Sequence, residues 1–259
     1  MSTEEERRSN IRSLTANRAW VVPTAILVTA AAAYANQSAR LVSWSGTEIN
    51  IAAGNFSGIL SDGGTTFSTE DMTLVDQSIQ ASGLATQGFI TLLLAETSAG
   101  LSLITLMDGI TDPSPPGAKT MTAATSFVPE TATWQYNVDA GGTFDSFPLG
   151  DQTVLSGAFQ WQSGIESEAF AISNLAFEDI GSITYNEILP GGLSPNNTIQ
   201  ILTSDGGTWS IANQFDFDPA DAGGPDFQYF DFEITAIPTP GVLAMLAVAG
   251  LSGRRRRRS

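Results

Sequence analysis

Carboxylates are the side chains best able to do chemistry in this 259-residue sequence, because it contains no cysteine and no histidine. Without histidine there is no imidazole base, no Ser-His-Asp triad and no histidine-bound metal. Without cysteine there is no thiolate nucleophile, no zinc-thiolate site and no disulfide framework. The chemistry that remains is acid/base work by paired carboxylates and cation binding by carboxylate clusters.

The first carboxylate pair is Glu166 and Glu168. Two positions apart on a strand, their side chains would share one face about 7 Å apart, a separation used in acid/base cleavage of glycosides. The simpler explanation is that both belong to a solvent-exposed acidic face. Jelly-roll glucanases carry a Glu-apolar-Asp-apolar-x-Glu type of strand motif, which this segment lacks. We therefore expect a non-enzymatic protein, and a carboxylate-only glycosidase is the weakest alternative.

The densest acidic stretch, residues 215–233, holds a candidate calcium site. Asp216, Asp218 and Asp221 precede a Gly-Gly pair, and Asp226 follows it. Ca²⁺ takes six to eight oxygen ligands, so this composition is typical of a calcium loop, although the spacing of an EF-hand is missing. The two explanations are a structural calcium site and a solvated acidic loop, and no other cofactor is expected.

The charge is distributed very unevenly along the chain. The whole sequence has a formal net charge of -16, but residues 36–236 carry only two basic side chains, Arg40 and Lys119, against 24 acidic ones, or -22. Nucleic-acid binding depends on clustered lysine and arginine, so nucleic acid is excluded as a partner. Self-repulsion of this size is screened by salt, which favours a saline extracellular setting.

Aromatic side chains suggest carbohydrate as an alternative ligand, because the faces of Trp and Tyr rings can stack on sugars. Trp44, Trp134, Trp161 and Trp209 lie on expected strands. Core packing is the default expectation for each of them.

The N-terminal segment has the layout of a secretory signal peptide. Residues 19–35, AWVVPTAILVTAAAAYA, follow an arginine-bearing segment and end in small residues around Ala33 and Ala35. This pattern predicts a signal-peptide helix within residues 1–35 and cleavage after Ala35. An uncleaved anchor or a buried helix is the alternative.

The C-terminal segment, residues 237–259, has three parts. Two prolines end the preceding strand, since each lacks an N–H and fixes φ. Residues 241–251 then form an uncharged apolar run that is shorter than the ~20 residues needed to span a bilayer. Five arginines follow: Arg254, Arg255, Arg256, Arg257 and Arg258. Arginines beside an apolar segment stay on the cytoplasmic side, so the body should lie across the membrane.

This tail resembles the bacterial PEP-CTERM sorting signal, which consists of a Pro-x-Pro motif, a short hydrophobic helix and a terminal arginine cluster. The motif residues here are Pro238, Thr239, Pro240 and Gly241, with Thr239 where the name-giving Glu usually stands. The resemblance covers about the last 22 residues. It implies secretion, transient anchoring in the inner membrane through the C-terminal helix, and processing near the Pro-x-Pro motif by an exosortase, a membrane protease-transpeptidase. The final location is then the cell envelope or the extracellular space, and the producers of such proteins often make exopolysaccharide.

The body between the two ends, residues 36–236, predicts an all-β fold. Its segments are short, rich in β-formers and broken by Gly/Asp/Asn clusters. Residues 227–237 alternate between two faces. The apolar face holds Phe230, Phe232, Ile234 and Ala236, and the other face holds Tyr229, Asp231, Glu233 and Thr235.

Further strands are expected at residues 47–52, 72–79, 89–96, 101–108, 132–139, 154–161, 168–175, 182–188, 199–204 and 208–213. Asp205-Gly206-Gly207 predicts a hairpin between the last two. Residues 89–96 and 101–108 are apolar on both faces, which indicates central strands of a covered sheet, with a buried helix at 88–96 as the alternative. Loops are expected at residues 110–119 and 189–197.

Together these features predict a single β-sandwich of jelly-roll type between a signal peptide and a sorting tail. The expected function is that of a non-enzymatic envelope or extracellular-matrix protein sorted by an exosortase-type system. The alternative is a carbohydrate-binding β-sandwich module, with calcium as a candidate cofactor, associated with exopolysaccharide.

Overall fold

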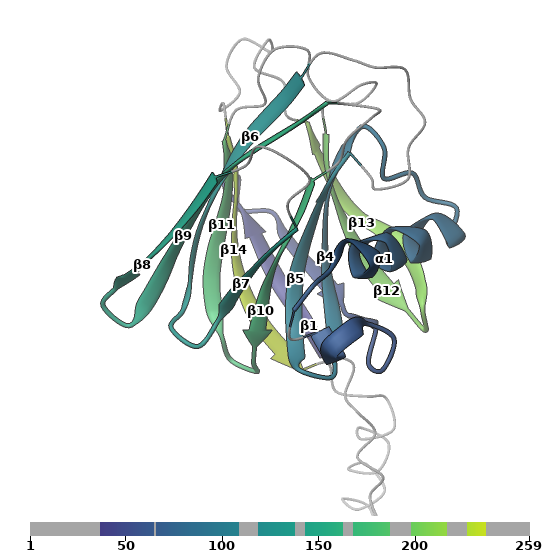
Figure 1. Ribbon diagram of the computed structural model, residues 1–259, viewed down its shortest axis with the longest axis horizontal. Helices are drawn as coiled ribbons and strands as arrows, with labels where there is room; N and C mark the ends of the chain where they lie inside the picture. The colour runs from purple at the N-terminus through teal and green to yellow at the C-terminus, as the bar shows by residue number, and fades with distance from the viewer. Residues whose placement is uncertain are drawn as a thin grey trace, which may run out of the picture. The chain divides into compact units, whose positions relative to one another are not determined.

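The computed structural model describes residues 37–64, 66–108, 119–137, 143–162, 168–186, 198–216 and 227–236. All of them belong to one compact unit of the chain, residues 34–259. The expected signal peptide, the sorting tail, the loop at 189–197 and all but the last residue of the loop at 110–119 lie outside the described residues. The described strands form two sheets (Figure 1).

Sheet A contains seven strands, and each pairs with its neighbours in antiparallel fashion. Their order across the sheet is β2 (Glu48–Ala52), β1 (Gln37–Ser43), β14 (Phe227–Ala236), β11 (Ile180–Asn186), β6 (Lys119–Pro129), β9 (Gln152–Gln162) and β8 (Thr143–Leu149). The first and last described strands, β1 and β14, therefore lie side by side in the same sheet.

Sheet B is the second seven-stranded sheet. Its main path runs β13 (Thr208–Asp216), β12 (Thr198–Asp205), β4 (Phe89–Thr97), β5 (Gly100–Met107), β10 (Glu168–Leu175) and β7 (Thr133–Asn137), and the short β3 (Gly54–Asn55) pairs with β4. The β12–β4 and β3–β4 pairs are parallel, and the other pairs are antiparallel.

The main hydrophobic core lies between the two sheets. It joins buried side chains of sheet A, such as Leu41 and Phe230, to buried side chains of sheet B, such as Leu92 and Leu103. The alternation expected for residues 227–237 is confirmed for the described side chains, because Phe230, Phe232 and Ile234 point into this core. Burying one such side chain contributes about 1.5–3 kcal/mol. The described part of the chain is thus an all-β sandwich with one short α-helix.

Two close contacts position strands of the sandwich, one between the sheets and one within sheet A. The hydroxyl groups of Thr105 on β5 and Tyr185 on β11 share a buried hydrogen bond of 2.7 Å, which links sheet B to sheet A. Within sheet A, the ring of Phe232 lies over Gly181, where an added Cβ would come within 2.5 Å of the Phe232 Cζ. Gly181 is therefore required by close packing.

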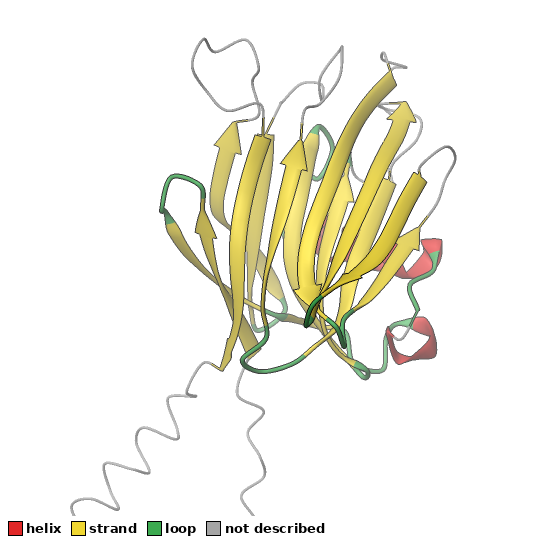
Figure 2. Cartoon of the chain, turned by 90° about the vertical axis from the view of Figure 1, so that its left-hand side faces the viewer, coloured by secondary structure: helices red, strands yellow, loops and turns green. Residues whose placement is uncertain are grey.

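Sheet B is covered on its outer face by helix α1 (Thr69–Ala81) and the segment before it (Figures 1 and 2). The second cluster of buried residues packs Met72, Val75 and Ile79 of the helix onto the outer side chains of β4 and β5. This confirms that residues 89–96 and 101–108 are adjacent central strands of a covered sheet. The alternative of a buried helix at 88–96 is wrong.

The expected strand at residues 72–79 is also wrong, because these residues belong to α1. The helix begins with a capping box, in which the Ser68 side chain accepts from the Asp71 N–H and the Asp71 carboxylate accepts from the Ser68 N–H. Buried residues then recur with helical spacing at Met72, Val75 and Ile79. The sequence contains this capping signal, but the β-branched residues Val75 and Ile79 also favour a strand.

The Asp71 carboxylate also ties the helix to the preceding loop. It accepts hydrogen bonds from the N–H groups of Ser61 at 2.7 Å and Ser68 at 2.8 Å, and from both hydroxyl groups. Burial alone would raise the pKa of Asp71, but these four hydrogen bonds outweigh it and hold the pKa below its ordinary value.

Most other expected strands are confirmed, with ends that differ by a few residues. The hairpin is confirmed too: Asp205 pairs with Thr208, and Gly206 and Gly207 adopt φ angles of 58° and 90°. Strands β1, β3, β6 and β8 were not expected. Strand β8 contains Pro148, which is tolerated because β8 lies at the edge of sheet A. Among the described residues, no helix has the length and hydrophobicity to cross a membrane.

Candidate functional site

The outer face of sheet A is the best candidate for a ligand-binding surface in the described part of the chain. Helix α1 packs on sheet B and not on sheet A. Most described outward side chains of sheet A keep some exposure. The pairing register places Val42, Asp231, Ser182 and Phe127 in one row across β1, β14, β11 and β6. Two polar side chains in the middle of this row are therefore flanked by two apolar ones.

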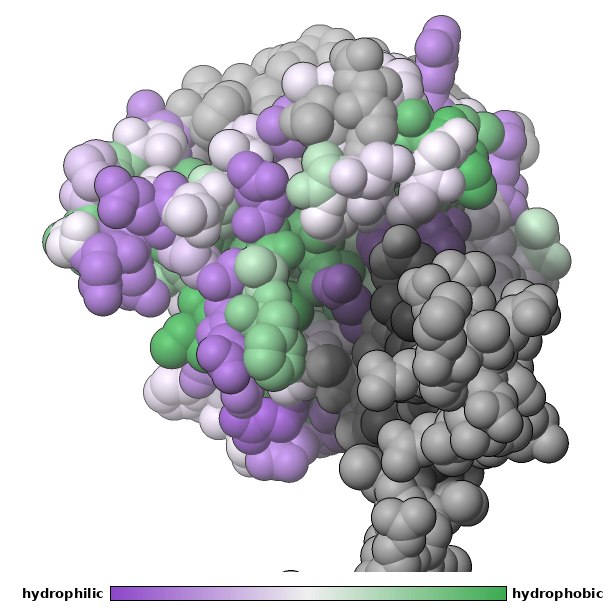
Figure 3. All heavy atoms as spheres, turned by 90° about the horizontal axis from the view of Figure 1, so that it is seen from below, coloured by the Kyte–Doolittle hydropathy of each residue, from purple (hydrophilic) through white to green (hydrophobic). Residues whose placement is uncertain are grey.

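A hollow with a volume of about 460 Å³ opens on this face. It is lined by Arg40, Val42, Phe127, Gln152, Ile180, Gly181, Ser182, Tyr229, Asp231, Phe232 and Glu233. Its size lies in the range of small-molecule pockets, about 300–1,000 Å³, and its lining combines apolar surface with a few polar groups, as such pockets do. Figure 3 shows hydrophobic and hydrophilic residues interleaved on the underside of the described body.

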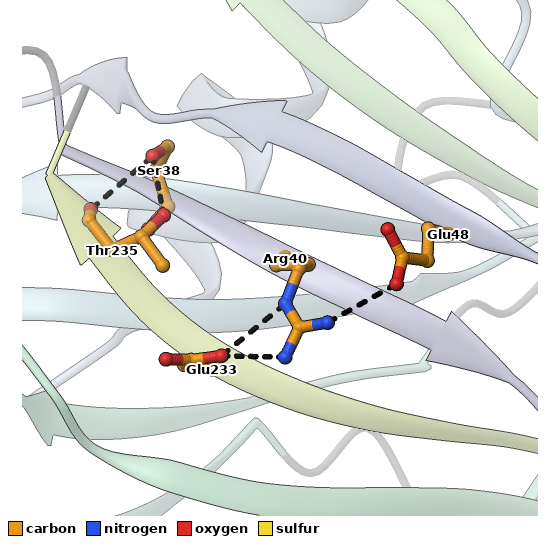
Figure 4. A network of polar contacts seen from close by, with 5 residues as sticks. All are labelled: Ser38, Arg40, Glu48, Glu233 and Thr235. Carbon is orange, nitrogen blue, oxygen red and sulfur yellow. Dashed lines mark hydrogen bonds and ion pairs between the residues drawn. The ribbon is translucent and has the colours of Figure 1, made fainter. Parts of the chain in front are cut away.

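Arg40 supplies the positive charge in this hollow. Its guanidinium contacts the Glu233 carboxylate at 2.7 Å and the Glu48 carboxylate at 3.3 Å (Figure 4). The hydrogen bond to Glu233 is the main reason that the pKa of Arg40 is raised, so the side chain stays charged. Because these groups are about half exposed, solvent screens both ion pairs and they contribute little to stability. The ion pairs serve mainly to hold the side chains in place.

The acidic groups outnumber Arg40. Asp231 and Glu233 line the hollow, and Glu48 stands at its edge against the same guanidinium. Three negative side chains and one positive one leave this part of the face acidic. It therefore offers hydrogen-bond acceptors more readily than donors.

Tyr229 and Asp231 form a second polar pair in the hollow. The Tyr229 hydroxyl donates a hydrogen bond to Asp231 Oδ1. Burial raises the pKa of Tyr229, and the bond to Asp231 raises it further. Tyr229 therefore stays protonated near neutral pH, and its half-buried ring provides apolar surface beside a carboxylate.

Trp44 lies on the same outer face, next to this pair. It follows β1 directly, and its backbone N–H donates to the Tyr229 carbonyl at 3.0 Å. Its side chain is 66% exposed and meets the Phe227 ring edge-on, with 5.5 Å between ring centroids. The expectation of core packing is wrong for Trp44, because the tight turn after Ser43 leaves the indole on the solvent side.

The other described indoles follow the default expectation. Trp134 stacks on Phe170 at 4.7 Å against the main core. Trp209 is buried over Phe56, and its indole N–H donates to the Ser78 hydroxyl at 3.0 Å. The side chain of Trp161 lies outside the described part of the chain.

Of the expected calcium ligands, only the backbone of Asp216 is described. It ends β13, where it pairs with Thr198, whereas Asp218, Asp221 and Asp226 lie outside the described residues. Within the described ranges there is no group of three or more acidic side chains arranged to hold a metal ion. The calcium site therefore stays a prediction.

The remaining expected sites lie largely outside the described ranges. This applies to the cleavage-site residues Ala33 and Ala35, to the sorting motif and arginine cluster within residues 237–259, and to Glu166. Glu168 is described, and it is 1% exposed at the start of β10. The expectation that Glu168 belongs to a solvent-exposed acidic face is wrong, because Glu168 lies on the same face of β10 as Phe170 and Ile172, which belong to the main core between the sheets.

Sequence reasoning did not identify the hollow. Two features of the sequence pointed to it, the polar face of residues 227–237 and the isolated Arg40. The residues that complete the hollow come from β1, β6 and β11, and only the strand pairing brings these strands together. No protein-family model, curated protein or solved structure matches this chain.

Proposed function

We propose that this chain is an exported, non-enzymatic protein of the bacterial cell envelope or extracellular matrix. The observation that carries this proposal is the tail, in which Pro238 and Pro240, an apolar run and five terminal arginines follow one another within residues 237–259. Its partners are the secretion machinery and an exosortase-type membrane protease-transpeptidase. The N-terminal apolar segment, residues 19–35, supports the same route.

The body suits this role. Its stability rests on apolar burial in two clusters without any cysteine, so it needs no redox machinery to fold. We propose that the sandwich is of jelly-roll type, and the antiparallel pairing of the terminal strands β1 and β14 supports this. The high negative charge of residues 36–236 keeps such a protein soluble in salt-containing surroundings.

The test compares the full chain in a bacterium that contains an exosortase and in the same strain without it. We expect the protein in the envelope or extracellular fraction of the first strain, and an uncut form at the inner membrane of the second. Replacing Arg254, Arg255, Arg256, Arg257 and Arg258 by serine should mimic loss of the exosortase. The matched control replaces them by lysine and keeps the positive charge. Identical distributions in both strains would overturn the proposal.

A second candidate function is carbohydrate binding, and one observation favours it. The exposed indole of Trp44 and the hollow that Tyr229 lines lie next to each other on one sheet face. Retention of the full chain on a panel of polysaccharides, with and without calcium, tests this function. No retention on any of them contradicts it.

A further inference from the structure

We propose that the outer face of sheet A binds an uncharged polysaccharide chain that lies along β1 and β14, with Trp44 as a stacking platform and the hollow as the adjoining subsite. This proposal rests on the carbohydrate-binding function and specifies its site and ligand class.

The direction follows from strand pairing. Outward positions on β1 and its continuation are Arg40, Val42 and Trp44, and these lie opposite Glu233, Asp231 and Tyr229 on β14. Alternate residues on a strand are about 7 Å apart, so Arg40 and Trp44 are separated by about 13 Å along the strand direction. This length exceeds one sugar ring, so the ligand is an extended chain rather than a monosaccharide.

Each end of this track offers a different contact. At one end the indole of Trp44, 66% exposed, presents a ring to which the C–H face of a sugar can stack. Asp231 in the middle and Glu233 at the other end offer carboxylate oxygens to sugar hydroxyls, and hydrogen bonds to charged acceptors are the stronger kind. Asp231 accepts from the Tyr229 hydroxyl through one oxygen, and a carboxylate has about four acceptor positions, so it can accept further bonds.

The charge of the hollow selects against anionic chains. The guanidinium of Arg40 already contacts Glu48 and Glu233, and Asp231 adds a further negative charge to the lining. A uronate or sulfate group placed here would meet more negative charge than positive. Such like-charge contacts suppress the wrong partner, so the carboxylates favour chains that present hydroxyl groups over chains that carry anionic groups.

Affinity electrophoresis of the full chain in non-ionic detergent tests the proposal. The gels contain dextran, mannan or hydroxyethyl cellulose as uncharged probes, or alginate as an anionic probe. We expect retardation by at least one uncharged probe and none by alginate. Trp44→Ala should weaken that retardation about tenfold, as truncation of an aromatic anchor does, and Asp231→Asn should weaken it as well.

Two matched controls lie on the other sheet. Ile211→Ala removes an exposed apolar side chain from β13, and Asp205→Asn removes a carboxylate at the β12–β13 turn. Both should leave retardation unchanged, and circular dichroism establishes that all variants are folded.

The possible failures are distinguishable. Absence of binding to every polysaccharide overturns the carbohydrate-binding function itself and the present proposal with it. Binding that Trp44→Ala and Asp231→Asn leave intact, or preferential binding of alginate, overturns only the proposed site and ligand class.

Discussion

Trp44 and Tyr229 face each other across the β1–β14 pair, where the backbone N–H of Trp44 donates to the backbone carbonyl of Tyr229 at 3.0 Å. This bond extends the pairing of the two strands beyond Ser43, the last residue of β1. It also fixes an exposed indole beside a hollow that contains carboxylates. Substitution of the surface residue Trp44 and of the core residue Trp209 should therefore affect stability differently.

Trp209→Ala should destabilise the protein by about 3–5 kcal/mol, because it removes a buried ring that packs on Phe56. Trp44→Ala should change stability by less than about 0.5 kcal/mol, since its side chain is mostly exposed. Urea denaturation of the two full-length variants measures both. Similar losses in the two variants would mean that Trp44 has a packing role.

The hydrogen bond between Thr105 and Tyr185 predicts a strong coupling across the sandwich. Tyr185→Phe leaves the buried Thr105 hydroxyl without this partner, at a cost of about 1–3 kcal/mol. Adding Thr105→Val removes the stranded hydroxyl and should recover part of that loss. A double-mutant cycle in urea measures the coupling, and purely additive effects would contradict it. The control is Tyr229→Phe, because it removes a tyrosine hydroxyl at a half-buried position.

Asp71 predicts a loss of stability in acid. Its pKa is lower in the folded chain than its ordinary value of about 3.9. Its contribution is therefore fully present above that value and is lost as the pH falls through the folded pKa. Asp71→Asn should lower stability at pH 7 and flatten its decrease below about pH 4. Glu70→Gln, on the same helical turn, should do neither when stability is measured by urea denaturation across pH.

Salt should stabilise the protein without selectivity for the cation. Residues 36–236 carry a formal charge of -22, and ions screen the resulting self-repulsion. Thermal melts of the full chain should therefore rise equally in NaCl, MgCl₂ and CaCl₂ of matched ionic strength, relative to EDTA. A larger rise in micromolar calcium alone would instead indicate a specific site at Asp216, Asp218, Asp221 and Asp226, which stabilises the folded state by mass action.

Local patterns in the sequence predicted the parts of the fold that depend on near neighbours. The period-2 alternation of β14 and the Asp205-Gly206-Gly207 turn were both predicted correctly, because one strand and one turn contain all the information needed. Helix α1 was missed because Val75 and Ile79 fit a strand as well as a helix. The cap at Ser68 and Asp71 decided between them.

The candidate site depends on distant neighbours and could not be predicted in the same way. Arg40 and Glu233 are 193 residues apart in the sequence, and they meet because β1 pairs with β14. The exposure of Trp44 likewise depends on the turn that follows Ser43. Composition alone favours burial for an isolated tryptophan, so its position on the outer face emerges only from the fold.

Export is the central proposal, and the ends of the chain recovered from native producing cells test it most directly. Intact-mass measurement and N-terminal sequencing of the protein should give a chain that begins at Asn36, found in the envelope or extracellular fraction. Processing near the sorting motif should also have removed Arg254, Arg255, Arg256, Arg257 and Arg258. A cytoplasmic protein that retains residues 1–35 and the arginine cluster would contradict the proposal.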